Sequence, residues 1–220
     1  EANKKIRTLP ENKNIIKLKD WENIWLNKTV VFYGANASWK TNILKWLEFL
    51  KYITLNSFKF GIEEWINHEL LKTFLLDENN LNKPIEFEIE FLIEKVKYRY
   101  FLKLNDKQIF EEKLIYFKKG RENLIFDYER INKEKSSLSS KWYTKDYFWE
   151  DISNLVPRYN QTFISILANK DWEWKYLATK IIKFFKLINF INSKADLTLF
   201  TIPMLETEEN KRIILSFIKI

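Results

Sequence analysis

The spacing of apolar residues changes twice along the chain and divides it into three parts. From residue 40 to residue 53 apolar positions recur every three or four residues, and between residues 84 and 130 they alternate with polar ones. From about residue 146 to residue 220 a helical spacing returns. Side chains share a face every 3.6 residues in a helix and every two residues in a strand. The pattern therefore predicts an α+β fold.

The first part predicts a strand, a loop and a helix within residues 28–53. Residues 29–33 form a short β-branched and aromatic run, which is typical of a buried strand. Residues 34–39 predict a turn, because they break this run before the helical spacing begins. The apolar face of the following helix consists of Ile43, Leu44, Leu47, Leu50 and Ile53.

The second part predicts an antiparallel meander of three or four strands over residues 84–130. Phe87, Ile89 and Phe91 alternate with three glutamates. In the next run, Tyr98, Tyr100 and Leu102 alternate with Lys97, Arg99, Phe101 and Lys103. Strict alternation is typical of a sheet with one face on a core and one in water. We expect the glutamates to face solvent and the sheet to lie beside the helix of the first part.

The remaining segments are predicted to be mainly helical. Residues 62–76 have helical spacing, whereas residues 132–145 are rich in Lys and Ser and predict a mobile surface loop. In the part from 146 to 220, residues 206–220 predict a final amphipathic helix. One further apolar helix face consists of Leu177, Ile181, Ile182, Phe185 and Leu187.

Composition narrows the possible chemistry. The 220 residues include no cysteine, which excludes disulfides, cysteine-ligated zinc and thiol catalysis, and the single histidine, His68, argues against a histidine metal site or a Ser-His-Asp triad. No apolar run reaches the roughly 18–20 residues that span a bilayer, so we expect a cytoplasmic protein without a membrane partner. The net charge of +7 is compatible with nucleic acid or nucleotide phosphates, but solvated lysine-rich faces are the more ordinary explanation.

One motif carries chemistry. Gly34 is followed by four residues, then Trp39, Lys40 and Thr41, which matches the phosphate-binding loop pattern except that Trp39 stands where the second glycine belongs. In such a loop, backbone N–H groups and the helix N-terminus hold the β-phosphate. Lys40 would reach the phosphates as a point charge, and the Thr41 hydroxyl would ligate Mg²⁺. The alternative is an ordinary strand–turn–helix with an incidental Lys-Thr pair.

Trp39 is the weak point of the motif. Glycine at this position lets the backbone approach the phosphates and adopt angles that a Cβ resists. The chain has only 3 glycines but 9 tryptophans. Because UGA and GGA differ by one base, and some genetic codes read UGA as glycine, we hypothesise that Trp39 stands where the native protein has glycine. The alternative is a degenerate loop.

Several segments resemble the AAA/ABC-type ATPases related to SMC, RecF and the OLD-like defence ATPases. Residues 31–44 are similar to their Walker A region, including Asn36 and Asn42, which generic phosphate-binding loops lack. Residues 84–91 and 96–100 are similar to the antiparallel sheet of lobe I in these proteins. Residues 160–168 resemble a segment that often reads Asn-x-x-Phe-Leu-Ser-x-x-Ala in this family.

The resemblance implies an ABC-type lobe I of a P-loop NTPase that binds ATP and Mg²⁺. Residues 1–220 would form a single N-terminal ATP-binding lobe with lobe II missing, and hydrolysis would need a homodimer that sandwiches the nucleotide. Thr41 and Gln161 would serve the metal ion, although Gln161 is equally well a helix-surface glutamine. The residues expected to bind nucleotide are Gly34, Ala35, Asn36, Ala37, Ser38, Trp39, Lys40, Thr41 and Asn42.

The sequence also departs from this family. No Leu-Ser-Gly-Gly-type signature is present, and residues 74–78, which imitate a Walker B strand, keep helical spacing. We therefore interpret Asp77 and Glu78 as a helix exit, leave the catalytic residue unassigned and expect little hydrolysis from this chain alone. The competing hypothesis is a non-hydrolysing nucleic-acid-binding or scaffold module with a degenerate loop. The biological process, DNA repair or phage defence, stays open.

Overall fold

The computed structural model describes the chain in segments. These are residues 15–17, 25–27, 29–33, 40–62, 64, 66, 83–131, 136–139, 156–169 and 176–190. The chain divides into two compact units, Glu1–Ile188 and Asn189–Ile220. Every element named below belongs to the first unit.

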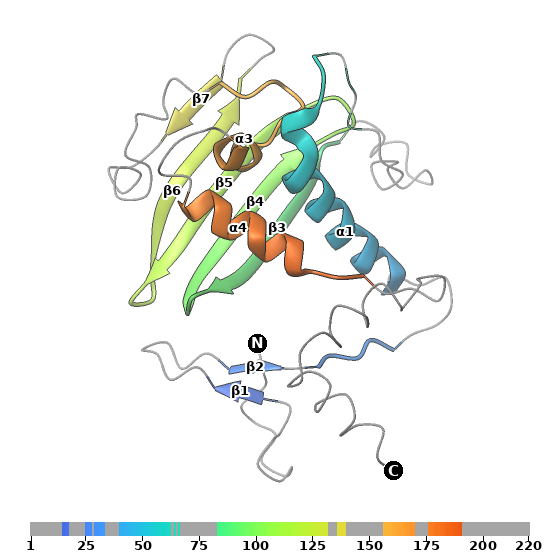
Figure 1. The fold of residues 1–220 in the computed structure, drawn as a ribbon. Coiled ribbons are helices and arrows are strands. Elements are labelled where there is room, and N and C mark those ends of the chain that lie inside the picture. The colour runs from blue at the N-terminus through green and yellow to red at the C-terminus, as the bar shows by residue number, and fades with distance from the viewer. Residues whose placement is uncertain are drawn as a thin grey trace, which may run out of the picture. The chain divides into compact units, whose positions relative to one another are not determined.

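A five-stranded antiparallel sheet forms the centre of this unit (Figure 1). Its strands follow one another in chain order: β3 Ile85–Ile93, β4 Val96–Leu104, β5 Ile109–Lys118, β6 Arg121–Arg130 and β7 Ser136–Ser139. The meander predicted for residues 84–130 is confirmed. The surface loop predicted for 132–145 is wrong over residues 136–139, which pair with β6. Backbone hydrogen bonds suffice for a polar edge strand, and its Leu138 packs against the core.

The alternation of side chains divides the sheet into two faces as predicted. On β4, Tyr98, Tyr100 and Leu102 are buried, and Phe91 on β3 is buried beside them. The glutamates of β3, at positions 86, 88 and 90, are exposed. Sheets with one face on a core and one in water alternate in this way.

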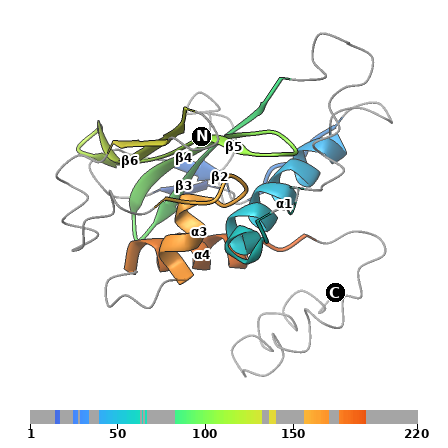
Figure 2. The same cartoon turned by 90° about the horizontal axis from the view of Figure 1, so that it is seen from above.

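Helices cover the apolar face of the sheet (Figures 1 and 2). They are α1 Lys40–Asn56, the short 3₁₀ turn η1 Ser57–Lys59, α3 Phe163–Asn169 and α4 Tyr176–Leu187. Aromatic rings join them to the strands: the ring centroids of Phe91 and Phe184 lie 4.5 Å apart and those of Phe126 and Phe163 lie 4.8 Å apart. The helix predicted from residue 40 is confirmed and continues to Asn56.

The apolar face predicted within α4 is confirmed except at its last residue. Leu177, Ile181, Ile182 and Phe185 are buried, but Leu187 is 78% exposed. Each helical residue turns by about 100° around the axis, so Leu187 lies about 200° from Phe185. Leu187 therefore points away from the side on which Phe185 packs.

The N-terminal region differs most from the prediction. Strands β1 Ile15–Lys17 and β2 Trp25–Asn27 pair in a separate two-stranded sheet that was not predicted. The buried strand predicted at residues 29–33 is wrong, because no described strand pairs with this segment and Tyr33 is 85% exposed. β-Branched side chains favour a strand only where a neighbour accepts its backbone hydrogen bonds.

Several predictions fall outside the described residues. They concern the remainder of the helix predicted for 62–76, Asp77 and Glu78, and the final helix of 206–220. The described residues of that first segment, at 62, 64 and 66, are not helical, so the prediction is wrong there.

Candidate functional site

The N-terminal end of α1 carries the described part of the predicted nucleotide site. Lys40 is the first residue of the helix, and Thr41 and Asn42 lie exposed in its first turn. The other six expected binding residues, 34–39, lie outside the described part of the chain. The structure thus places a lysine and a hydroxyl at a helix start, which is where a phosphate-binding loop requires them.

The charge at this end of the helix favours an anion. The first turn of α1 contains no acidic residue. The first backbone N–H groups of a helix have no partner within the helix, and the aligned peptide dipoles place about half a positive charge there. No carboxylate of the first turn offsets this charge, so this end of the helix is suited to an anion.

The first half of α1 extends beyond the packed core. Phe49 is its first buried residue, whereas Leu44 is 54% exposed and Trp46 is 44% exposed. Two residues that are seven positions apart on a helix lie within about 20° of each other around its axis, so Trp46 is on the same side as the buried Ile53. Trp46 nevertheless lies outside the packed core, although it is on the same side of the helix as Ile53.

Gln161 lies at the opposite end of α1. Its side-chain Nε2 donates to the Phe58 carbonyl oxygen at 3.0 Å, and its Oε1 accepts from the Arg158 backbone N–H at 3.3 Å. From Thr41 to the start of η1 the helix rises about 24 Å. The structure therefore does not bring Thr41 and Gln161 together, and Gln161 is buried rather than on a helix surface.

The segment that contains Gln161 fastens the end of α1 to the rest of the fold. The Thr162 backbone N–H donates to the Ser57 hydroxyl at 3.0 Å, and the Phe58 N–H donates to the Ser165 hydroxyl at 3.0 Å. Asn160 donates to the carbonyl oxygens of Gly61 and Glu64, at 2.8 and 2.7 Å. These contacts give residues 160–165 an anchoring role that the sequence did not predict. The sequence feature that could have indicated this role is the polar run of residues 160–162 directly before the apolar residues of α3.

One buried carboxylate lies beside this segment. Glu112 on β5 is fully buried and accepts hydrogen bonds from the Tyr100 hydroxyl at 2.9 Å, from the Ile164 N–H at 3.0 Å and from the Phe163 N–H. Burial raises its pKa to about 7, although these three hydrogen bonds oppose the rise. Glu112 was not predicted, because a glutamate in an alternating strand reads as solvent-facing.

Two further properties of the described residues bear on function. They contain no group of three acidic or histidine side chains that could hold a metal ion. None of their helices is both long enough and apolar enough to cross a membrane.

A family model described as "AAA domain, putative AbiEii toxin, Type IV TA system" matches residues 30–197. No curated protein and no solved structure matches the chain.

Proposed function

The chain belongs to this AAA domain family, because the match covers well over half of its 220 residues, and we propose that it binds MgATP at the N-terminal end of α1. The observation that carries the proposal is the position of Lys40 and Thr41 in the first turn of a 17-residue helix. A domain of this family supplies the expectation of an ATPase-type function. The start of α1 supplies the side chains that such a function needs.

The described residues fit the proposed ligand. Lys40 would hold the β- and γ-phosphates, and Thr41 would offer its hydroxyl oxygen to Mg²⁺, which takes oxygen ligands. The phosphates would supply most of the remaining metal ligands, since Mg²⁺ is commonly held by few protein groups together with substrate phosphates. Asn42 and the loop of residues 34–39 would complete the phosphate contacts.

Hydrolysis is a second step of the proposal. When bound, Mg²⁺ would neutralise the charge that develops on the transferred phosphoryl group. We assign hydrolysis to a dimer that sandwiches the nucleotide, as the resemblance to ABC-type ATPases implies. Gln161 would have to act there from a position other than the one described here.

The test uses Trp39. Replacing the expected glycine by tryptophan denies the loop amides their close approach, and each lost hydrogen bond to a charged group is worth roughly 1.5–3 kcal/mol. Losing two weakens binding by about two to four orders of magnitude. We therefore expect Trp39→Gly to bind MgATP measurably by isothermal titration calorimetry and the parent chain to bind far more weakly.

Lys40→Ala in the Trp39→Gly background is the matched loss-of-function variant, and we expect it to remove binding. Lys45→Ala, one turn further along the same helix, is the control and should bind like its parent. Equal affinities of the parent and Trp39→Gly would refute the occlusion argument. Retention of binding in Lys40→Ala would refute the site itself.

A further inference from the structure

The β5–β6 hairpin ends in a cluster of exposed cations. Lys118 closes β5, Lys119 and Gly120 form the turn, and Arg121 opens β6, and all four residues are exposed. Lys119 and Gly120 have φ values of 53° and 73°, as a tight two-residue hairpin requires. The turn therefore presents three positive side chains within four consecutive residues.

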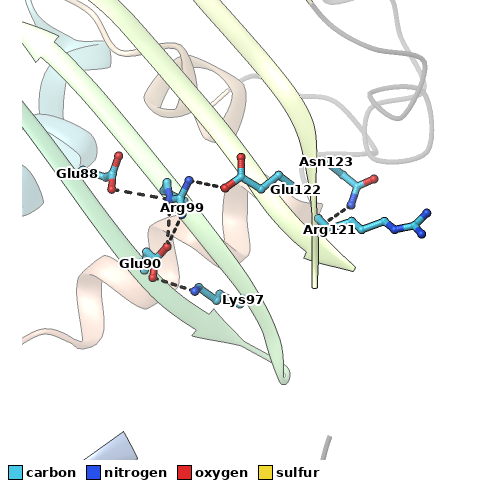
Figure 3. A network of polar contacts seen from close by, with 7 residues as sticks. All are labelled: Glu88, Glu90, Lys97, Arg99, Arg121, Glu122 and Asn123. Atoms are coloured by element: carbon cyan, nitrogen blue, oxygen red, sulfur yellow. Dashed lines mark hydrogen bonds and ion pairs between the residues drawn. The ribbon is translucent and has the colours of Figure 1, made fainter. Parts of the chain in front are cut away.

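The nearby carboxylates are already engaged by other cations. Glu122 accepts a hydrogen bond from Arg99 at 2.6 Å, and Arg99 also contacts Glu90 at 2.8 Å (Figure 3). Lys97 pairs with Glu90 at 2.9 Å, and these two cations hold the pKa of Glu90 below its usual value, although burial opposes that effect. Figure 3 shows Arg121 pointing away from this network.

The three tip cations have no carboxylate partner among the described residues. No ion pair joins Lys118, Lys119 or Arg121 to any part of the chain that the structure describes. The β3–β4 turn lies at the same end of the sheet, about 10 Å away across two strand spacings. Its carboxylate, Glu94, pairs with Lys180 of α4 and so does not offset the tip cations. This end of the sheet is therefore positive.

The side chains around the tip favour double-stranded over single-stranded nucleic acid as a ligand. The aromatic ring next to the tip in the chain, Phe117, is 8% exposed. It is covered by Lys97, whose Nζ lies 4.5 Å from the ring centroid, and by the Arg99 guanidinium at 5.1 Å. No described ring at this end is thus open for stacking on unpaired bases, on which single-strand binding depends. Double-stranded nucleic acid has the higher charge density, with one phosphate per about 1.7 Å of axis.

We propose that the cationic tip formed by Lys118, Lys119 and Arg121 binds the phosphate backbone of double-stranded DNA without reading its sequence. The contact is independent of nucleotide binding at α1. Three phosphate contacts correspond to a salt slope of about −2.7, and hence to a roughly 40-fold loss of affinity between 50 and 200 mM salt.

The experiment measures binding of the full chain to a fluorescent 20-base-pair DNA duplex by anisotropy, without ATP, at several salt concentrations. We expect the triple variant Lys118→Gln, Lys119→Gln, Arg121→Gln to lose about tenfold or more in affinity at 50 mM salt and to show a slope shallower by about 2.7. The charge-preserving triple variant, with arginine at 118 and 119 and lysine at 121, should retain both.

A charge-matched control removes three exposed lysines elsewhere, Lys59, Lys107 and Lys186, by substitution with glutamine. If this variant loses as much affinity as the tip variant, or if the parent chain does not bind the duplex at 50 mM salt, the proposal is overturned. A third arm uses phosphatidylserine vesicles. Loss of vesicle binding by the tip variant with unchanged DNA affinity would assign the tip to a membrane surface and overturn the proposal as well.

Discussion

Glu112 provides the sharpest test of the core, because its ionisation is coupled to folding. The carboxyl group is fully buried, and its pKa of about 7 lies above its ordinary value of 4.5. Between these two values the folded protein keeps the proton and the unfolded chain releases it. The stabilisation is therefore fully present below pH 4.5 and is lost as the pH rises through 7, a difference of about 3 kcal/mol.

The informative substitution is Glu112→Gln. The glutamine oxygen can replace Oε1, which accepts hydrogen bonds from the Tyr100 hydroxyl and the Ile164 N–H. The glutamine NH₂ group would then replace Oε2 and face the Phe163 N–H, which is itself a donor. One unpaired buried donor costs about 1–3 kcal/mol. We expect the variant to be less stable than the parent at pH 5. By pH 8 the parent carries a buried charge, so its advantage should fall by about 2–3 kcal/mol between pH 5 and pH 8.

The assay is urea denaturation followed by tryptophan fluorescence at pH 5, 6, 7 and 8 and constant ionic strength. The comparison of parent and variant cancels the titration of every other group. Glu111→Gln is the control, because Glu111 faces the opposite side of β5 and pairs with Lys113 at 3.1 Å. A parent-minus-variant difference that stays constant from pH 5 to pH 8 would refute a raised pKa. A difference that grows with pH would show that hydrogen bonding outweighs burial.

Two further predictions follow from the packing of α1. Gln161→Ala should lower the free energy of unfolding by about 1–3 kcal/mol, because the Phe58 carbonyl and the Arg158 N–H lose their partner, while MgATP affinity in the Trp39→Gly background stays unchanged. A loss of affinity without a loss of stability would instead support the metal-ligand role. Phe49→Ala should cost about 3–5 kcal/mol and Trp46→Ala less than about 1 kcal/mol, because only Phe49 is fully buried. Similar costs in chemical denaturation would place Trp46 in a core after all.

The cationic tip of the β5–β6 hairpin is defined by the ion pairs of the sheet rather than by the local sequence. In sequence, the cations of residues 118–121 resemble any other lysine-rich turn, and the net charge of +7 fits many solvated surfaces. The sheet assigns the carboxylates to partners by register, so Glu122 meets Arg99 two strands away. The register of the strands therefore decides which charged side chains have an ion-pair partner.

Local patterns determined the meander, α1 and the faces of the strands. Alternation at Phe87, Ile89 and Phe91, and helical spacing from residue 40, are one-dimensional signals that the backbone geometry imposes on any amphipathic element. The family could be predicted for a similar reason, because the residues of a phosphate-binding loop motif are consecutive in the sequence. Lys40 and Thr41 could thus be assigned to a helix start from the sequence.

Contacts between distant segments decided the rest. The segment of residues 29–33 has the composition of a buried strand, but burial needs a partner that its own sequence does not specify. Gln161 and Glu112 have polar side chains that the sequence assigned to a metal ion and to solvent. The structure instead places Gln161 against Phe58, 103 residues away, and Glu112 against Phe163, 51 residues away. A buried polar group is stable only with a hydrogen-bond partner, and that partner is set by the tertiary fold.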